Sequence, residues 1–134
     1  SGFEARLVRS GGDRRVCLIG VGKMLAAATE AAEILEADGI RATVWDPRVV
    51  KPLDRIMLED AASHDLVVTI EDGFREGGAG TAIEMALRDM RSPVRVEILG
   101  VPVTFIPHAN PDVILARLGL DGDGVATSVR TALA

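Results

Sequence analysis

One stretch at the centre of this sequence reads Leu66-Val67-Val68-Thr69-Ile70-Glu71-Asp72-Gly73-Phe74-Arg75-Glu76-Gly77-Gly78-Ala79-Gly80. Residues 66–70 are almost entirely apolar, which is typical of a short strand that is buried on both faces. Two carboxylates end this strand, and a loop then leads into a glycine-rich helix start. In an open α/β sheet, a strand-to-helix turn of this kind marks the edge at which ligands and partners bind.

The segments on both sides of this stretch alternate between strand and helix patterns. We expect further strands at residues 3–9, 16–21, 42–45 and 94–99, and helices at residues 24–38, 55–63, 80–90, 111–118 and 125–134. The first and last strands alternate apolar and polar residues, which favours the two edges of the sheet. This order predicts an α/β fold, a three-layer α/β/α sandwich around a mostly parallel sheet, formed as a single domain over residues 1–134.

Individual residues mark where several of these elements end. Gly39 follows a helix in the position that a left-handed cap requires, and Asp54 is a good N-cap for the next helix. Residues 120–124, which contain two glycines, are interpreted as a flexible turn before the last helix.

Composition excludes several classes of function. The chain of 134 residues has a net charge of −5 and only 3% aromatic residues, which argues against binding to a phosphate backbone or to stacked bases. It contains no apolar run of membrane-spanning length, so we expect no membrane contact. The single cysteine, Cys17, lies in an apolar strand and fits a reducing cytoplasm.

A nucleotide site is one alternative that the residues leave open. Gly20-Val21-Gly22 follows a buried strand and opens a helix, and Asp46 ends the next strand at the spacing of a ribose-binding acid. Leu25, however, stands where the dinucleotide fingerprint needs glycine or alanine for close helix packing. A tight β-to-α turn without a ligand is therefore favoured.

The acidic cluster of Glu71, Asp72 and Glu76 could serve as an acid–base pair or a metal site. Adjacent carboxylates at a strand end diverge, and no histidine or cysteine is near in sequence to complete a metal set. We therefore favour solvated side chains or side chains that cap the following helix, and we expect no catalytic, cofactor-binding or metal-binding residue in this chain.

The glycines at 77, 78 and 80 could let a phosphate approach the helix start, or let a neighbouring domain or subunit pack closely. His108 lies on a loop and is a better functional candidate than His64, which falls at a helix end where a positive charge suits the helix dipole. The candidate interdomain or dimer surface comprises Glu71, Asp72, Gly77, Gly78, Gly80 and His108.

Two motifs of this chain resemble those of a known family. The first resembles the strand-and-loop signature of the transketolase C-terminal domain and reads Gly39-Ile40-Arg41-Ala42-Thr43-Val44-Trp45-Asp46-Pro47-Arg48-Val49-Val50-Lys51-Pro52-Leu53-Asp54. The second resembles the other signature of that domain and reads Val67-Val68-Thr69-Ile70-Glu71-Asp72-Gly73, followed by Gly77-Gly78-Ala79-Gly80. The tail, with Phe105-Ile106-Pro107-His108-Ala109 and Leu118-Gly119-Leu120-Asp121, is similar to that of the 1-deoxy-D-xylulose-5-phosphate synthase family. The equivalent domains of transketolases and of 2-oxo acid dehydrogenase β subunits stay as alternatives.

The resemblance implies a five-stranded mixed sheet whose first strand is antiparallel to the others. It also implies that the chain is the third domain of a longer, cytoplasmic, homodimeric enzyme. That enzyme would condense pyruvate with D-glyceraldehyde 3-phosphate in isoprenoid, thiamine and pyridoxal biosynthesis. Thiamine diphosphate and magnesium would bind to the other domains, so that this domain alone would be inactive and would support the dimer. Gly122-Asp123-Gly124 matches only the beginning of the thiamine diphosphate motif, and the chain ends before the asparagine that completes it.

Overall fold

The computed structural model describes residues 4–72, 78–100 and 111–134. In this part of the chain, strands and helices alternate almost as the sequence pattern predicts. The strands are β1 (Arg6–Arg9), β2 (Val16–Gly20), β3 (Thr43–Asp46), β4 (Leu66–Glu71) and β5 (Arg95–Gly100). The helices are η1 (Gly22–Met24), α1 (Leu25–Glu36), α2 (Arg55–Ala62), α3 (Ala79–Asp89), α4 (Pro111–Arg117) and α5 (Gly122–Leu133).

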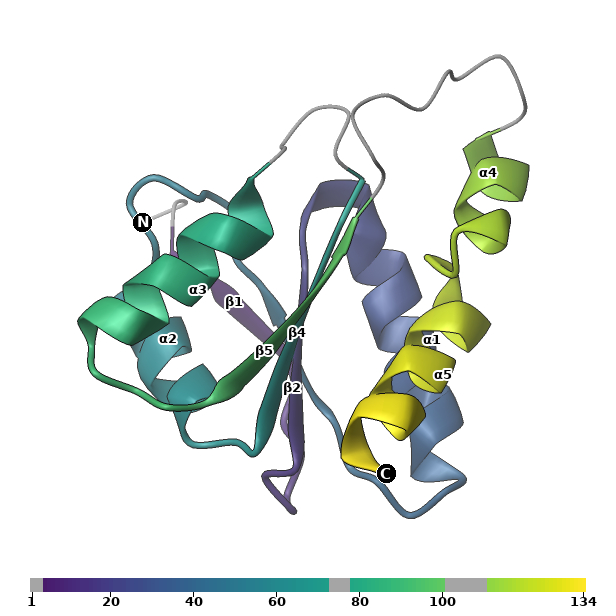
Figure 1. Ribbon diagram of the computed structural model, residues 1–134, viewed down its shortest axis with the longest axis horizontal. Helices are drawn as coiled ribbons and strands as arrows, with labels where there is room; N and C mark the ends of the chain where they lie inside the picture. The colour runs from purple at the N-terminus through teal and green to yellow at the C-terminus, as the bar shows by residue number, and fades with distance from the viewer. Residues whose placement is uncertain (1–3, 73–77, 101–110) are drawn as a thin grey trace.

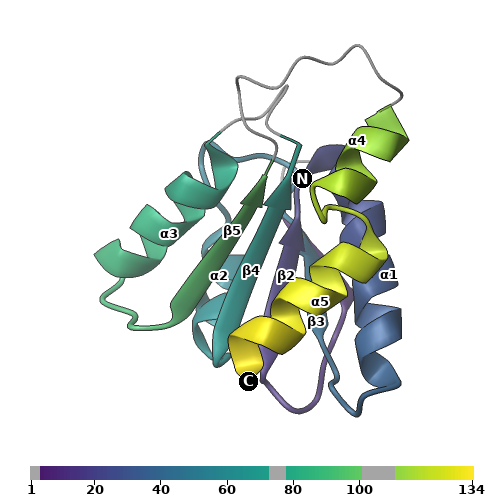
Figure 2. The same ribbon diagram turned by 45° about the vertical axis from the view of Figure 1, so that its right-hand side comes forward.

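The five strands form one mixed sheet in the order β1-β3-β2-β4-β5. β1 pairs antiparallel with β3, and all other pairs are parallel. Helices α1 and α5 cover one face of the sheet, and α2 and α3 cover the other (Figures 1 and 2). The predicted α/β/α sandwich, its antiparallel first strand and both edge strands are therefore confirmed.

Each face of the sheet has its own apolar core. Val16 and Leu18 of β2 contribute to the core under α1 and α5, whereas Cys17 and Ile19 of the same strand contribute to the core under α2 and α3. All five residues of β2 and all six residues of β4 are buried, as expected for central strands that are covered on both faces. Burial raises the pKa of the Cys17 thiol, which makes this cysteine an inert packing residue, as predicted.

The helix ends confirm two predicted caps and correct one interpretation. Gly39 adopts a φ of 79°, and the carboxylate of Asp54 accepts a hydrogen bond from the Met57 backbone N–H at 3.0 Å. The interpretation of residues 120–124 as a flexible turn is wrong. Asp121 is the N-cap of α5, and its carboxylate accepts a hydrogen bond from the Gly124 backbone N–H at 2.8 Å, so the helix begins three residues earlier than the pattern suggests.

His64 has a different environment from the one that its position at a helix end suggests. It is buried, and both ring nitrogens are bonded: Nδ1 lies 2.8 Å from the Asp60 carbonyl oxygen and Nε2 lies 3.0 Å from Thr43 Oγ1. A carbonyl oxygen can only accept, so Nδ1 carries the proton. The imidazole therefore joins α2 to β3 instead of stabilising the helix end as an exposed cation.

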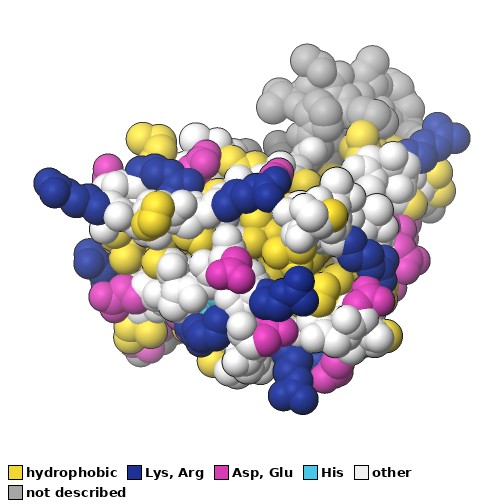
Figure 3. All heavy atoms as spheres, turned by 60° about the horizontal axis from the view of Figure 1, so that its bottom comes forward, with side chains coloured by type: hydrophobic (Ala, Val, Ile, Leu, Met, Phe, Trp, Pro, Cys, Tyr) yellow, Lys and Arg dark blue, Asp and Glu magenta, His cyan; other side chains and the backbone are white. Residues whose placement is uncertain are grey.

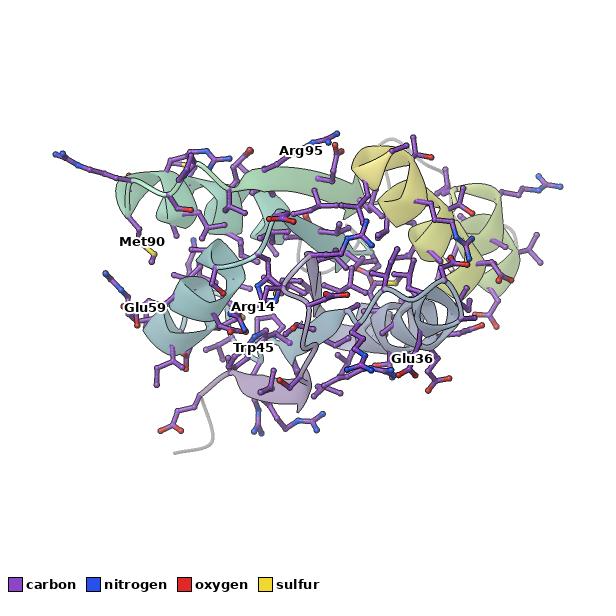
Figure 4. All side chains as sticks on the ribbon, turned by 90° about the horizontal axis from the view of Figure 1, so that it is seen from below. Arg14, Glu36, Trp45, Glu59, Met90 and Arg95 are labelled. Atoms are coloured by element: carbon purple, nitrogen blue, oxygen red, sulfur yellow. The ribbon has the colours of Figure 1, made fainter. Side chains whose placement is uncertain are left out.

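The Asp60 carboxylate forms a second polar link between α2 and the sheet. It accepts hydrogen bonds from Trp45 Nε1 at 2.7 Å and from the Arg14 guanidinium at 2.6 Å. Figure 4 shows Arg14 and Trp45 close together beside α2. Burial alone would raise the pKa of Asp60, but these two donors outweigh it and hold the pKa below its ordinary value of 3.8.

This lowered pKa predicts a pH-dependent effect of Asp60→Asn. Because the folded state favours the ionised carboxylate, its contribution is present above about pH 4 and is lost as the pH falls through the folded-state pKa. We expect Asp60→Asn to lower the free energy of unfolding at pH 7, and we expect this difference to shrink as the pH approaches about 2. Urea unfolding of both proteins across this range, with Asp89→Asn on the exposed face of α3 as the control, measures the effect. A difference that is independent of pH would contradict it.

The lower face of the molecule carries both signs of charge. Basic and acidic side chains are interspersed there (Figure 3), and several form ion pairs, such as Arg130 with Asp38 at 2.6 Å. Among the helices that the structure describes, none has the length and apolar character needed to cross a membrane.

Candidate functional site at the carboxyl edge of the sheet

Glu71 is the last residue of β4, and it holds the start of α3 in place. Its side chain is buried, with 5% of the residue exposed. One carboxylate oxygen accepts a hydrogen bond from the Ala79 backbone N–H at 3.0 Å, and the other accepts one from the Gly80 N–H at 3.1 Å. These two donors belong to the first turn of the helix, where they have no partner within the helix. Of the alternatives for Glu71, the helix cap is the one that the structure supports.

Asp72 points to the opposite side of the sheet from Glu71. It is also buried, and its carboxylate lies 3.8 Å from the ammonium group of Lys23 in η1, on the face that α1 covers. The expected divergence of the two carboxylates is therefore confirmed. Two acids that contact different layers cannot act together on one ligand, so they do not form an acid–base pair.

Gly80 allows α3 to lie unusually close to the sheet. A Cβ atom at this position would lie 2.5 Å from Thr69 Oγ1 and 2.6 Å from Ile98 Cγ2. Thr69 is fully buried, and its hydroxyl has no hydrogen-bond partner among the described residues. Gly80 thus lets α3 pack closely against β4 and β5 inside the domain, which is a different role from the two considered in the sequence. Gly78 is exposed and precedes the helix with a φ of 91°.

A groove of about 750 Å³ lies beside the start of α3. One wall is the loop that follows β3, with Arg48, Val49, Val50 and Lys51, and the other is α3, with Gly78 and the exposed Met85. Arg48 and Lys51 are exposed, and neither side chain has an ion pair with another of the residues that the structure describes. The groove therefore combines an apolar wall with two available positive charges.

The described parts of both motifs, residues 47–53, 71–72 and 78–80, thus lie at one edge of the sheet. The chain matches the family described as "Transketolase, C-terminal domain" over residues 4–125. This chain belongs to that family. The relation predicted from the two motifs is confirmed.

Curated relatives of this chain are much longer proteins. The chain is 47% identical over 120 residues to 1-deoxy-D-xylulose-5-phosphate synthase 1 of Kitasatospora griseola, which covers 90% of this chain and 18% of that protein. It is 42% identical over 128 residues to the synthase of Synechococcus sp. (strain JA-2-3B'a(2-13)), with coverage of 95% and 19%. The chain therefore spans about a fifth of the length of these curated relatives.

Solved structures show the same fold. A structure titled "Split gene transketolase, inactive beta4 tetramer" superposes with a TM-score of 0.85 at 33% identity, over 99% of this chain and 43% of that chain. Transketolase from Campylobacter jejuni gives a TM-score of 0.68 at 14% identity, over 97% of this chain and 19% of that chain, which shows the fold alone.

The Gly122-Asp123-Gly124 segment has a packing role at the start of α5. Gly122 and Gly124 lie in the first turn of α5, where an added Cβ would lie 2.5 Å from Glu30 and from the Gly119 backbone, respectively. Both glycines thus serve packing. Within residues 4–72, 78–100 and 111–134, no three His, Cys, Asp or Glu side chains come together as metal ligands.

The residues of the nucleotide alternative also have structural roles. A Cβ at Gly20 would lie 2.7 Å from Leu25 Cα, so this glycine permits the tight turn from β2 into the helix. The Asp46 carboxylate accepts a hydrogen bond from the Arg48 backbone N–H at 3.0 Å and lies 3.8 Å from the Arg6 guanidinium. These contacts support the ligand-free turn that the sequence favours.

Gly77 and His108 lie outside the described residues, so their predicted places in the surface stay predictions. The sequence pattern did not connect Arg48 and Lys51 with α3. The sequence marks residues 47–52 as a loop, because a proline stands at each end of this segment. Where the loop lies relative to α3 depends on tertiary contacts.

Proposed function

We propose that this chain is the C-terminal domain of a 1-deoxy-D-xylulose-5-phosphate synthase. The observation that carries the proposal is the 47% identity over 120 residues with a protein of that name. Such an enzyme condenses pyruvate with D-glyceraldehyde 3-phosphate and releases carbon dioxide. Since the chain spans about a fifth of its relatives, the remaining parts of the enzyme would bind thiamine diphosphate and magnesium and carry the reacting groups.

In this proposal the domain supports the assembled, cytoplasmic homodimer and takes no part in the chemical step. The docking surface is the groove between residues 48–51 and α3, which Gly78 lines, and we include Gly77 and His108 on the strength of the sequence prediction alone. Glu71 supports this surface from inside the domain, because it holds the first turn of α3. The available cations at Arg48 and Lys51 favour an apolar partner segment that carries acidic residues.

The enzymatic part of the proposal is tested with the full-length enzyme that contains this domain. We expect it to convert pyruvate and D-glyceraldehyde 3-phosphate into 1-deoxy-D-xylulose 5-phosphate only when thiamine diphosphate and a divalent cation are present. We expect no product from residues 1–134 alone. Lack of turnover by the full-length enzyme, or turnover by the isolated domain, would overturn this part.

The docking surface is tested by charge reversal in the full-length enzyme. Arg48→Glu/Lys51→Glu should weaken dimerisation or lower turnover by about tenfold or more, because it places negative charge against an acidic partner. The control is Arg91→Glu/Arg117→Glu, which makes the same charge change at two exposed arginines that do not line the groove. Gly78→Asp and His108→Ala probe the adjoining loops. Normal assembly and turnover in all these variants would rule out the surface.

The equivalent domain of a transketolase is the second candidate, and the 33% identity with the split-gene transketolase favours it. The two candidates differ in their products, so the same full-length enzyme assayed with a ketose phosphate donor and an aldose acceptor separates them.

A further inference from the structure

The outer edge of β5 is a second candidate binding surface of this domain, because its backbone groups can pair with another strand. Within residues 4–72, 78–100 and 111–134, β5 is an edge strand, and its one paired neighbour in the sheet is β4. Its register with β4 is unbroken over six residues, from Leu66 opposite Arg95 to Glu71 opposite Gly100. Figure 1 looks onto this margin of the sheet, and α3 and α5 lie to the two sides of β5. A regular strand of this length presents backbone donors and acceptors that another strand can pair with.

The opposite edge of the sheet is protected in two ways that β5 lacks. The register of β1 shifts between Leu7 and Arg9, which interrupts the regular backbone pattern. The two charged residues of β1, Arg6 and Arg9, have the same sign, so that two copies of this edge would repel each other. The register of β5 with β4 is continuous, and the charged residues of β5 include both signs.

The charges on β5 are instead complementary to themselves. Arg95 and Glu97 are two residues apart, so they lie on the same face of the strand, where their side chains are 2.9 Å from each other. If a second copy of β5 pairs antiparallel around a two-fold axis at Val96, each Arg95 lies opposite Glu97 of the other copy. The four charges then alternate in sign, and opposite charges at directly paired positions stabilise an antiparallel pair.

The other face of β5 supports the same register. Val96 would lie opposite itself, and Ile98, which is 40% exposed, would lie opposite Val94 of the second copy. Pairs of β-branched residues at facing positions are favourable in antiparallel sheets. A register centred on Glu97 would instead place two carboxylates opposite each other, which is unfavourable. One alignment therefore satisfies both faces.

We propose that β5 is a self-association strand, by which two copies of this domain join their sheets antiparallel with Val96 at the two-fold axis. The contact is isologous, since the same strand serves both copies. It differs from the groove of the proposed function, whose lining includes no residue of β5. A domain that fails to dock through the groove can therefore still pair through β5, and the reverse also holds.

Charge reversal tests the proposal on the chain of residues 1–134. We expect the wild-type chain to dimerise reversibly in sedimentation equilibrium, with a Kd below about 1 mM. Arg95→Glu and Glu97→Lys should each weaken dimerisation by about tenfold or more, because two attractive cross-strand pairs become repulsive. An equimolar mixture of the two variants should form a heterodimer with nearly wild-type affinity, because a positive edge then faces a negative edge. The double variant Arg95→Glu/Glu97→Lys should dimerise again.

A cross-link tests the register itself. In the proposed pair, Val96 faces its own copy at the distance of directly opposed side chains, about 5 Å between Cβ atoms. Val96→Cys should therefore oxidise to a covalent dimer, while the only native cysteine, Cys17, is buried and does not react. Arg6→Glu on β1 is the matched control for Arg95→Glu and should leave the dimer unchanged. Circular dichroism confirms that each variant is folded.

Three results would overturn the proposal. The first is a wild-type chain that stays monomeric up to about 1 mM. The second is a dimer that neither charge reversal weakens, which would place the contact elsewhere. The third is a mixture of the two single variants that stays monomeric, since repulsion in each variant alone would then have a cause other than the facing charges.

Discussion

Replacement of Glu71 by alanine is expected to lower the free energy of unfolding by about 2–4 kcal/mol. The variant removes the acceptor of two backbone N–H groups, those of Ala79 and Gly80, at a position where only 5% of Glu71 is exposed to solvent. Each buried donor that loses its partner costs about 1–3 kcal/mol, and water reaches this site poorly. Because domains are stable by only about 5–15 kcal/mol, the midpoint of urea unfolding should fall clearly.

Two further variants test whether the lost helix cap causes the lower stability of Glu71→Ala. Glu71→Gln keeps the size of the side chain, but it offers one acceptor oxygen and turns an amide group toward the second N–H, so an intermediate loss is expected. Glu59→Ala is the control, since Glu59 is an exposed glutamate on α2 that pairs only with Arg55 at 3.6 Å in the described structure. A loss below about 0.5 kcal/mol for Glu71→Ala would show that the cap is unimportant.

The second large effect is expected from Gly80→Ala. An alanine in place of glycine inside a helix usually stabilises a protein by up to about 1 kcal/mol. Here the added Cβ would lie 2.5 Å from Thr69 Oγ1 and 2.6 Å from Ile98 Cγ2, and both neighbours are β-branched side chains with little freedom to move. We expect overpacking to outweigh the helix propensity and to destabilise the fold by about 1–3 kcal/mol.

Thermal unfolding measures this effect, at about 3–4 °C of melting temperature for each kcal/mol in a chain of this length. Thr69→Ala removes one of the two obstructing atoms, so the combination of Thr69→Ala with Gly80→Ala should cost less than the sum of the single changes. Gly12→Ala is the control, because a Cβ there meets only the end of the Arg41 side chain at 3.9 Å. A melting temperature of Gly80→Ala at or above that of the wild type would contradict the prediction.

Features that depend on near neighbours in the chain were predictable from the sequence. The apolar run of β4 predicts a buried central strand, and Gly39 and Asp54 predict the ends of their helices, because a cap acts within one helical turn. Alternating residues correctly predict that β1 and β5 are the edges of the sheet. Asp121 is also a cap that acts within one helical turn, but the glycines beside it are more typical of a turn than of a helix start.

The sequence by itself therefore determined the layers, the order of the elements and the family. The tertiary structure decided what the polar residues at the edge of the sheet contact. Glu71 meets helix donors eight and nine residues away, and His64 reaches Thr43 across the sheet. The groove beside Arg48 forms only because a loop and α3, far apart in sequence, lie side by side. Such contacts depend on how the layers pack in space, and no periodicity or local propensity encodes that packing.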